Sequence, residues 1–314
     1  MRKALIVGIN NYPDAELTSA VRDATEIANV LERHGNGSPN FDIKLLIDPP
    51  TSITKAILRE NIEALFKGRS DISLLYFSGH GFITSLGGFI VTPDYEKYDE
   101  GISMDDILKY VNKSEARDRV IILDCCHSGA FGSPQLSGGY SALGEGVTVL
   151  TASKEDESAL EIGEKSVFTS LLINALQGGS ADLRGHITPG SIYSYIDSAL
   201  GPWDQRPVFK TNVSTFISLR QIHPPVPLEV LRKLIDYFKS PTDEFRLDPS
   251  YEFTTDSAIN EHVEIFKNLQ RFESVGLVVP VGEEHMYFAA INNKSCKLTA
   301  LGYQYWRLVR ENKI

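Results

Sequence analysis

The sequence predicts an α/β fold in which a mostly parallel sheet is flanked by helices, followed by a small α+β domain. Short apolar segments such as Lys3–Val7 and Arg119–Leu123 alternate with amphipathic helical segments up to about residue 220. This alternation is typical of a parallel sheet that is covered by helices on both faces. A proline-rich stretch then marks a change of pattern, so the 314 residues are expected to form two domains.

The elements of the first domain follow from the spacing of apolar residues. Strands are expected at Lys3–Val7, Asp42–Ile47, Asp71–Phe77, Gly88–Val91, Arg119–Leu123 and Val147–Ala152, with a last strand from Val208–Lys210 and Thr215–Leu219. Helices are expected at Leu17–His34, Thr51–Phe66, Ser103–Val111, Ser166–Leu176 and Thr188–Ala199. In such a fold, ligand and catalytic groups lie beyond the carboxyl ends of the strands.

A domain boundary is expected where prolines 224, 225 and 227 make the chain stiff and extended. We therefore divide the chain into residues 1–222, a linker at 223–227 and residues 228–314. The last region is expected to contain helices at Leu228–Lys239, Asp256–Val275 and Leu298–Val309, with a hairpin formed by Leu277–Val281 and His285–Ala290. Helices followed by a hairpin resemble a winged helix, and the alternative is an unrelated small α+β domain.

Composition excludes several classes of protein. The net charge is −10 and Lys and Arg form no basic block, so nucleic-acid binding is not expected. No apolar stretch is long enough for a membrane span or a signal peptide. The three cysteines include an adjacent pair and no CxxC spacing, which argues against a disulfide framework and a zinc site. A cytoplasmic protein without membrane contact is expected.

Two motifs that carry reactive side chains follow consecutive inner strands. The string YFSGHG places His80 between glycines, and LDCCHSG places Cys125 and Cys126 after the next strand. A nearby imidazole can take the proton of a thiol and leave a nucleophilic thiolate. Alone, a cysteine is more often a buried apolar residue, and a loop histidine more often a surface group. Their joint occurrence at strand ends favours a catalytic Cys–His dyad.

These motifs resemble those of the caspase-like cysteine peptidases of clan CD (C14), and within them the metacaspases and prokaryotic caspase homologues. Ser78–Gly81 matches the histidine motif, Asp124–Gly129 matches the nucleophile motif, and the separation between them is typical. The resemblance extends over about residues 1–220. It implies that Cys126 is the nucleophile and His80 handles the proton, while Cys125 packs in the core. It also implies that the backbone N–H groups of Gly81 and Cys126 hold the oxyanion.

The same resemblance implies an acidic S1 pocket that accepts Arg or Lys, because metacaspases have one. The matching positions are Asp23, Ser78 and Asp124. The two carboxylates among them would bind a guanidinium by charge-assisted hydrogen bonds. The alternative is that Asp23 caps or solvates a helix and Asp124 braces the loop.

The resemblance implies that no cofactor is required and leaves a calcium site open. Asp94, Asp105 and Asp106 match three aspartates that bind calcium in many metacaspases, but a fourth appears here as Ser133. Calcium prefers six to eight oxygen ligands, so this loss weakens the site. The alternative role of Asp105 and Asp106 is to cap a helix.

The function expected is therefore a cysteine endopeptidase that cleaves protein substrates after Arg or Lys. The resemblance to prokaryotic homologues implies a regulated effector in a defence or cell-suicide system. The alternative is a non-catalytic caspase-like scaffold, although such scaffolds typically lose one member of the dyad.

Regulation is expected to depend on the C-terminal domain rather than on self-cleavage. Acidic residues outnumber basic ones in 228–314, which favours docking of a regulatory protein partner over DNA. The linker Ala130–Gly146 contains no Lys or Arg. An enzyme specific for Arg or Lys could not cut itself there, so the protease is expected to work as an uncut single chain.

Overall fold

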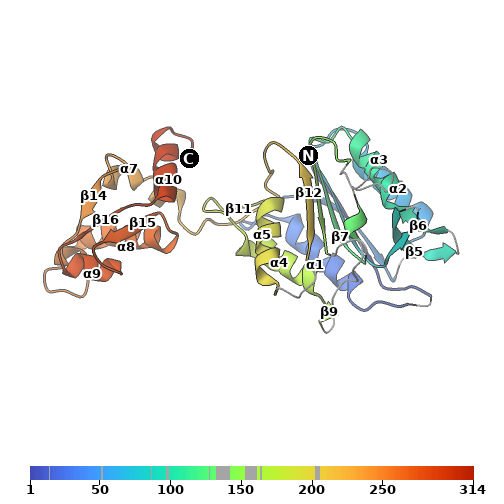
Figure 1. Cartoon of the computed structure of the whole chain (residues 1–314), viewed down its shortest axis with the longest axis horizontal. Coiled ribbons are helices and arrows are strands. Elements are labelled where there is room, and N and C mark those ends of the chain that lie inside the picture. The colour runs from blue at the N-terminus through green and yellow to red at the C-terminus, as the bar shows by residue number, and fades with distance from the viewer. Residues whose placement is uncertain are drawn as a thin grey trace. The chain divides into compact units, whose positions relative to one another are not determined.

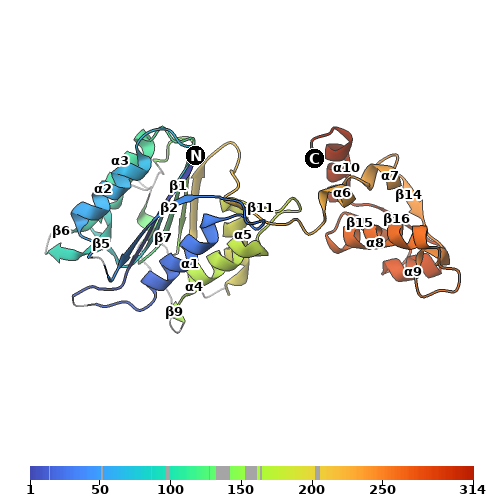
Figure 2. The ribbon, with the colours of Figure 1, turned by 180° about the vertical axis from the view of Figure 1, so that it is seen from behind.

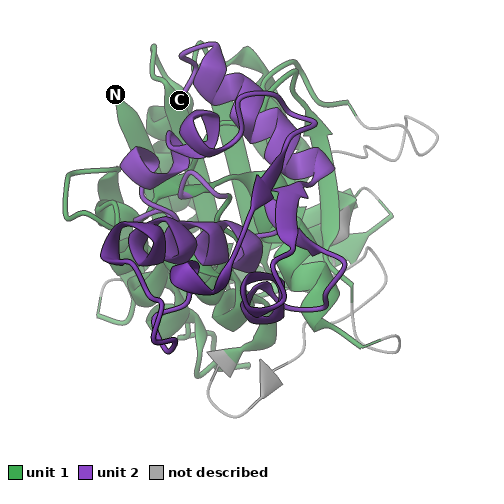
Figure 3. Ribbon diagram, turned by 90° about the vertical axis from the view of Figure 1, so that its left-hand side faces the viewer, with its two compact units in different colours: residues 1–182, 186–222 green, residues 183–185, 223–314 purple. Residues whose placement is uncertain are grey.

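The chain forms two compact units in the computed structural model. One contains residues 1–182 and 186–222, and the other contains 183–185 and 223–314 (Figure 3). The structure describes residues 1–13, 15–50, 52–85, 87–96, 99–126, 128–131, 142–152, 161–162, 165–201 and 206–314. Most of the linker Ala130–Gly146 lies outside the described residues. Within the part of the chain that is described, no helix is long and apolar enough to cross a membrane.

The first unit is built on a six-stranded sheet with the order β12-β8-β7-β3-β1-β2. Its strands are β1 (Arg2–Ile9), β2 (Asp42–Asp48), β3 (Ile72–Ser78), β7 (Asp118–Asp124), β8 (Val147–Thr151) and β12 (Val208–Asn212). All neighbours pair in parallel except β12, which is antiparallel to β8. The predicted mostly parallel sheet is therefore confirmed, with β3 and β7 as inner neighbours.

Helices cover both faces of this sheet, as the alternation in sequence predicts (Figures 1 and 2). One face carries α1 (Ala20–Glu32), α4 (Val167–Asn174) and α5 (Pro189–Ala199), and the other carries α2 (Lys55–Phe66) and α3 (Met104–Lys113). Successive strand residues point to opposite faces. Leu75 and Phe77 accordingly join the core under α2 and α3, whereas Leu74 and Tyr76 join the core under α1 and α4.

Smaller strands complete the first unit. An antiparallel sheet contains β4 (Gly81–Thr84), β5 (Gly87–Glu96) and β6 (Asp99–Ser103), and two short pairs are β9 (Glu161–Ile162) with β10 (Lys165–Ser166) and β11 (His186–Ile187) with β13 (Arg220–Gln221). The strand predicted at Thr215–Leu219 is wrong. Arg2 donates hydrogen bonds to the carbonyls of Ser218 and Leu219, so a side chain takes the acceptors that a neighbouring strand would use.

The second unit has its own apolar core, which includes Phe238, Phe272 and Trp306. Its elements are α6 (Leu228–Leu231), α7 (Leu234–Tyr237), β14 (Glu244–Arg246), α8 (Asn260–Ser274), β15 (Val278–Val281), α9 (Met286–Ile291), β16 (Ser295–Leu298) and α10 (Ala300–Arg310). The strands form an antiparallel sheet with the order β14-β16-β15. A small α+β arrangement is present, but the winged-helix assignment is not confirmed.

Two predictions for the second unit are wrong. The segment His285–Ala290 is not a strand, because α9 spans Met286–Ile291 and buries Met286, Ala289 and Ala290 at helical spacing. The strand that pairs with β15 is instead β16. The single helix predicted over Leu228–Lys239 is split into α6 and α7, where the Lys233 N–H bonds to the Val230 carbonyl three residues back.

Candidate active site

The two sequence motifs meet at one edge of the sheet. The last residues of β3 and β7, Ser78 and Asp124, are paired in register, and His80 and Cys126 each follow two residues later. The Gly79 N–H lies 3.4 Å from the carbonyl oxygen of Asp124 and bonds to it. The parallel register therefore brings the histidine loop and the cysteine loop into contact.

Gly81 permits this close approach. A Cβ atom at this position would lie 3.1 Å from the carbonyl carbon of Cys126 and from the sulfur of Cys125, and closer still to the carbonyl oxygen of Cys126. Backbone atoms cannot move aside as a flexible side chain can. The second glycine of the SGHG motif is therefore required for the His80 and Cys126 loops to pack against each other.

His80 is held by two residues that the sequence analysis missed. The backbone N–H of His80 donates to Tyr12 Oη at 3.0 Å, and Tyr12 Oη donates to the Val91 carbonyl at 3.2 Å. The two rings also meet edge to face, with centroids 4.5 Å apart. Burial raises the pKa of Tyr12, so the phenol stays protonated and keeps this bridge. Tyr12 follows β1, at the same edge of the sheet, which is the signal that could have identified it.

The second missed group is the carbonyl oxygen of Ala15. It lies 2.6 Å from His80 Nε2. Because a carbonyl only accepts hydrogen bonds, Nε2 must carry the proton, and Nδ1 of the neutral ring is left as the acceptor. This fixes the tautomer that a general base needs. Every residue has a backbone carbonyl, whatever its side chain. The sequence alone therefore gave no signal for the role of the Ala15 carbonyl.

The dyad residues line a cavity of about 290 Å³. Its lining residues are Leu17, Ser19, Ser78, Gly79, His80, Asp124, Cys125, Cys126 and Ser166. Cys126 is partly exposed, whereas Cys125 is 1% exposed and packs in the core. Burial, with smaller contributions from Cys126 and Asp124, raises the pKa of the Cys125 thiol, which therefore stays protonated. Of the adjacent cysteines, Cys126 is the one open to a substrate.

The predicted S1 residues gather at this cavity, though in different positions. Ser78 and Asp124 line it, and Asp124 Oδ2 accepts a hydrogen bond from Thr169 Oγ1 at 2.7 Å. Asp23 is fully buried and accepts a hydrogen bond from the N–H of Ser166, itself a lining residue, at 3.4 Å. Asp124 therefore forms part of the cavity wall. Asp23 does not line the cavity, but it bonds to Ser166, which does.

The charges of Asp23 and Asp124 both affect the pKa of the same buried residue, Tyr76. Burial raises the pKa of Tyr76 well above its usual value, and the charges of Asp124 and Asp23 raise it further. The hydroxyl of Thr169 lies 2.6 Å from Tyr76 Oη and also donates to Asp124. This part of the unit interior therefore combines two acidic side chains with a polar network that positions Asp124.

Two of the three predicted calcium residues have other partners. Both carboxylate oxygens of Asp94 accept the Lys55 N–H at the start of α2, at 3.0 and 3.1 Å. Asp106 forms ion pairs with Lys109 and Arg59, and Asp105 lies in the first turn of α3. Among the described residues, no three His, Cys, Asp or Glu side chains form a group that could hold a metal ion. Calcium dependence stays a prediction.

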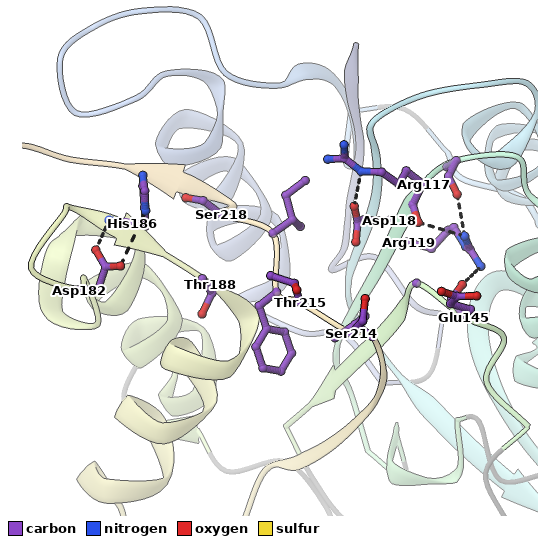
Figure 4. A pocket seen from close by; sticks show the side chains of 15 residues that line it. Arg117, Asp118, Arg119, Glu145, Asp182, His186, Thr188, Ser214, Thr215 and Ser218 are labelled. Atoms are coloured by element: carbon purple, nitrogen blue, oxygen red, sulfur yellow. Dashed lines mark hydrogen bonds and ion pairs between the residues drawn. The ribbon is translucent and has the colours of Figure 1, made fainter. Parts of the chain in front are cut away.

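A larger cavity of about 840 Å³ is drawn in Figure 4. It shares no described lining residue with the cavity of the dyad. It includes Asp118 at the start of β7 and Gly146 just before β8, so it lies at the opposite ends of these strands. Its Arg119 donates to the carbonyls of Ala116 and Glu145, and His186 pairs with Asp182. Its size does not make it the catalytic site, because its described lining contains no cysteine.

Comparisons with known proteins agree with this fold. A structural-genomics protein from Geobacter sulfurreducens has a similar structure, with a TM-score of 0.53, 16% identity, and coverage of 71% of this chain and 100% of that one. Caspase-1 from Spodoptera frugiperda gives a TM-score of 0.52 and 12% identity, over 70% of this chain and 90% of that one. At these identities the likeness shows the fold alone. No curated protein matches the chain significantly.

A family model gives the assignment that structural likeness alone does not. The model described as the caspase domain of the C14 peptidases matches residues 1–212. The match covers most of the chain and includes both strand-end motifs. We conclude that this chain belongs to the caspase-domain family of cysteine peptidases.

Proposed function

We propose that the chain is a cysteine endopeptidase that cleaves protein substrates after Arg or Lys, with Cys126 as nucleophile and His80 as general base. The observation that supports this most strongly is the meeting of the two motifs at one cavity, which has Asp124 in its wall. The chain retains both members of the dyad, which favours an enzyme over a caspase-like scaffold.

The proposed chemistry begins with proton transfer from the Cys126 thiol to Nδ1 of His80. The thiolate attacks the peptide carbonyl, and the N–H groups of Gly81 and Cys126 stabilise the oxyanion. His80 then gives the proton to the departing amine, and water hydrolyses the thioester. The hydrogen bond from Nε2 to the Ala15 carbonyl supports this direction of transfer, because it uses Nε2 as a donor and leaves Nδ1 as the nitrogen that can accept the thiol proton.

The proposed preference for a basic residue at P1 is supported by the charges around the cavity. Asp124 is only 4% exposed and Asp23 is fully buried, and the described lining contains no Lys or Arg side chain. A guanidinium or ammonium that enters would be paired with carboxylate, whereas an acidic side chain would be repelled in an environment of low dielectric. Ser78 supplies a further polar group at the wall.

The second unit is proposed to dock a regulatory protein partner in the cytoplasm. It leaves large apolar side chains exposed, including Phe253, Tyr287 and Phe288, and such surfaces often mark interaction sites. Acidic residues outnumber basic ones in this region, which disfavours nucleic acid. A role as an effector in prokaryotic defence or cell suicide is supported by the resemblance of the motifs to prokaryotic caspase homologues.

The test is a panel of internally quenched peptides that differ only at P1, run with and without calcium. We expect cleavage after Arg and Lys, none after Asp, and complete loss of cleavage in Cys126→Ala and His80→Ala. Cys125→Ala is the matched cysteine control and should keep substantial activity. Efficient cleavage after Asp, or an active Cys126→Ala variant, would refute the proposal.

A further inference from the structure

A second cavity borders the dyad and has a different character. Its volume is about 410 Å³, and it is lined by Tyr12, Ala15, His80, Gly81, Phe82, Val91, Tyr95 and Glu96. His80 is the one lining residue that it shares with the cavity of Cys126 and Asp124. The imidazole therefore separates a cavity with an acidic wall from one lined mainly by aromatic and aliphatic side chains.

The chemistry of cleavage determines which part of a substrate meets each cavity. When the carbonyl carbon bonds to Cys126 Sγ, the C–N bond breaks and the departing nitrogen takes the proton from His80. That nitrogen must come within hydrogen-bond reach of the imidazole. If the P1 side chain enters the acidic cavity, the residue that carries the departing nitrogen lies against His80 and continues past it.

We propose that the second cavity is the S1′ subsite and that it binds a large apolar side chain at P1′. This inference rests on the proposed function, and it adds the residue that follows the scissile bond to the substrate class. The cavity volume falls within the range of about 300–1,000 Å³ that is usual for small-ligand pockets. Phe82 is 44% exposed on β4, so it presents an unburied aromatic surface that a P1′ side chain can cover.

Two residues that line this subsite also hold the His80 loop in place. Tyr12 and Val91 are both buried. The Tyr12 hydroxyl accepts from the His80 backbone N–H and donates to the Val91 carbonyl. Val91 N–H also donates to the His80 carbonyl at 2.9 Å. Among the described lining residues, Glu96 is the one carboxylate, and it is exposed. An apolar P1′ residue is therefore accommodated without burying a charge, and an acidic one meets Glu96.

The first test uses quenched peptides with Arg at P1 and Leu, Phe, Ser, Asp or Lys at P1′. We expect kcat/KM for Leu and Phe to exceed that for Ser by about tenfold, the usual scale for filling an apolar pocket, with Asp lowest. Equal rates for Leu and Ser would overturn the inference. If Lys were the best residue at P1′, the inference would also be overturned, because the charge of Glu96 rather than the apolar wall would then determine the P1′ preference.

A charge placed in the cavity gives a sharper test. In Phe82→Lys we expect the order to reverse, so that Asp at P1′ is cleaved better than Leu. Phe216→Lys is the matched control, since Phe216 is also exposed, at 38%, but belongs to neither cavity, and it should keep the wild-type order. A ratio of rates within one sample is insensitive to partial misfolding. An unchanged order in Phe82→Lys would overturn the inference.

Binding separates this inference from the proposed function. In Cys126→Ala, which cannot form the acyl-enzyme, the Leu and Ser peptides should differ in Kd in the same direction as in kcat/KM. If the wild-type protein cleaves no peptide, the proposed function fails, but a tighter Kd for the Leu peptide still supports the apolar subsite. Equal Kd values would overturn the subsite even if cleavage after Arg is efficient.

Discussion

Replacing Gly81 with alanine tests whether contact between the two motif loops is needed for activity. The new Cβ would lie 3.1 Å from the carbonyl carbon of Cys126 and closer still to its oxygen. Since carbon atoms in contact are ordinarily about 3.5–4.0 Å apart, the His80 and Cys126 loops would have to separate by roughly 1 Å. A displacement of this size at a catalytic pair can reduce the rate by about 100-fold.

The assay for Gly81→Ala combines kcat/KM on an Arg peptide with urea unfolding. We expect kcat/KM to fall by about 100-fold and the free energy of unfolding to fall by about 1–3 kcal/mol, the usual cost of overpacking. Gly144→Ala is the control, because its nearest neighbour would be the Asn112 side-chain oxygen at 3.2 Å. Full activity in Gly81→Ala would refute the argument that these loops must touch.

Three further predictions concern the wall of the cavity, the support of His80 and the linker after the nucleophile. Asp124→Asn should lower kcat/KM for Arg peptides by about 100-fold while retaining an acceptor for Thr169, and an unchanged preference between Arg and Ala at P1 would contradict the S1 assignment. Tyr12→Phe should lower the free energy of unfolding by about 1–3 kcal/mol, because the His80 N–H and the Val91 carbonyl lose their partner. Equal stability would show that Tyr12 is not a support. Intact-mass analysis of fully active protein should find no cut within Ala130–Gly146, and activity confined to fragments cut there would refute the single-chain prediction.

Strand-level features could be predicted because they depend on local pattern. Apolar segments indicated β3 and β7, and the rule for parallel sheets placed His80 and Cys126 at one edge. The segment around Met286 was misassigned because a short apolar run has no period that separates strand from helix. The Ala15 carbonyl was missed because a backbone acceptor does not constrain its own side chain. The two cavities beside His80 depend on contacts between distant segments, which periodicity does not report.

The measurement that tests the central claim most directly is covalent labelling with a peptide that carries Arg at P1 and an electrophile in place of the scissile bond. Intact mass followed by peptide mapping should find one adduct, on Cys126. His80→Ala should abolish it, and the matching Asp probe should not react. Cys125 should stay unlabelled, because burial raises the pKa of its thiol and keeps it protonated. An adduct on Cys125, or equal labelling by the Asp probe, would contradict the account.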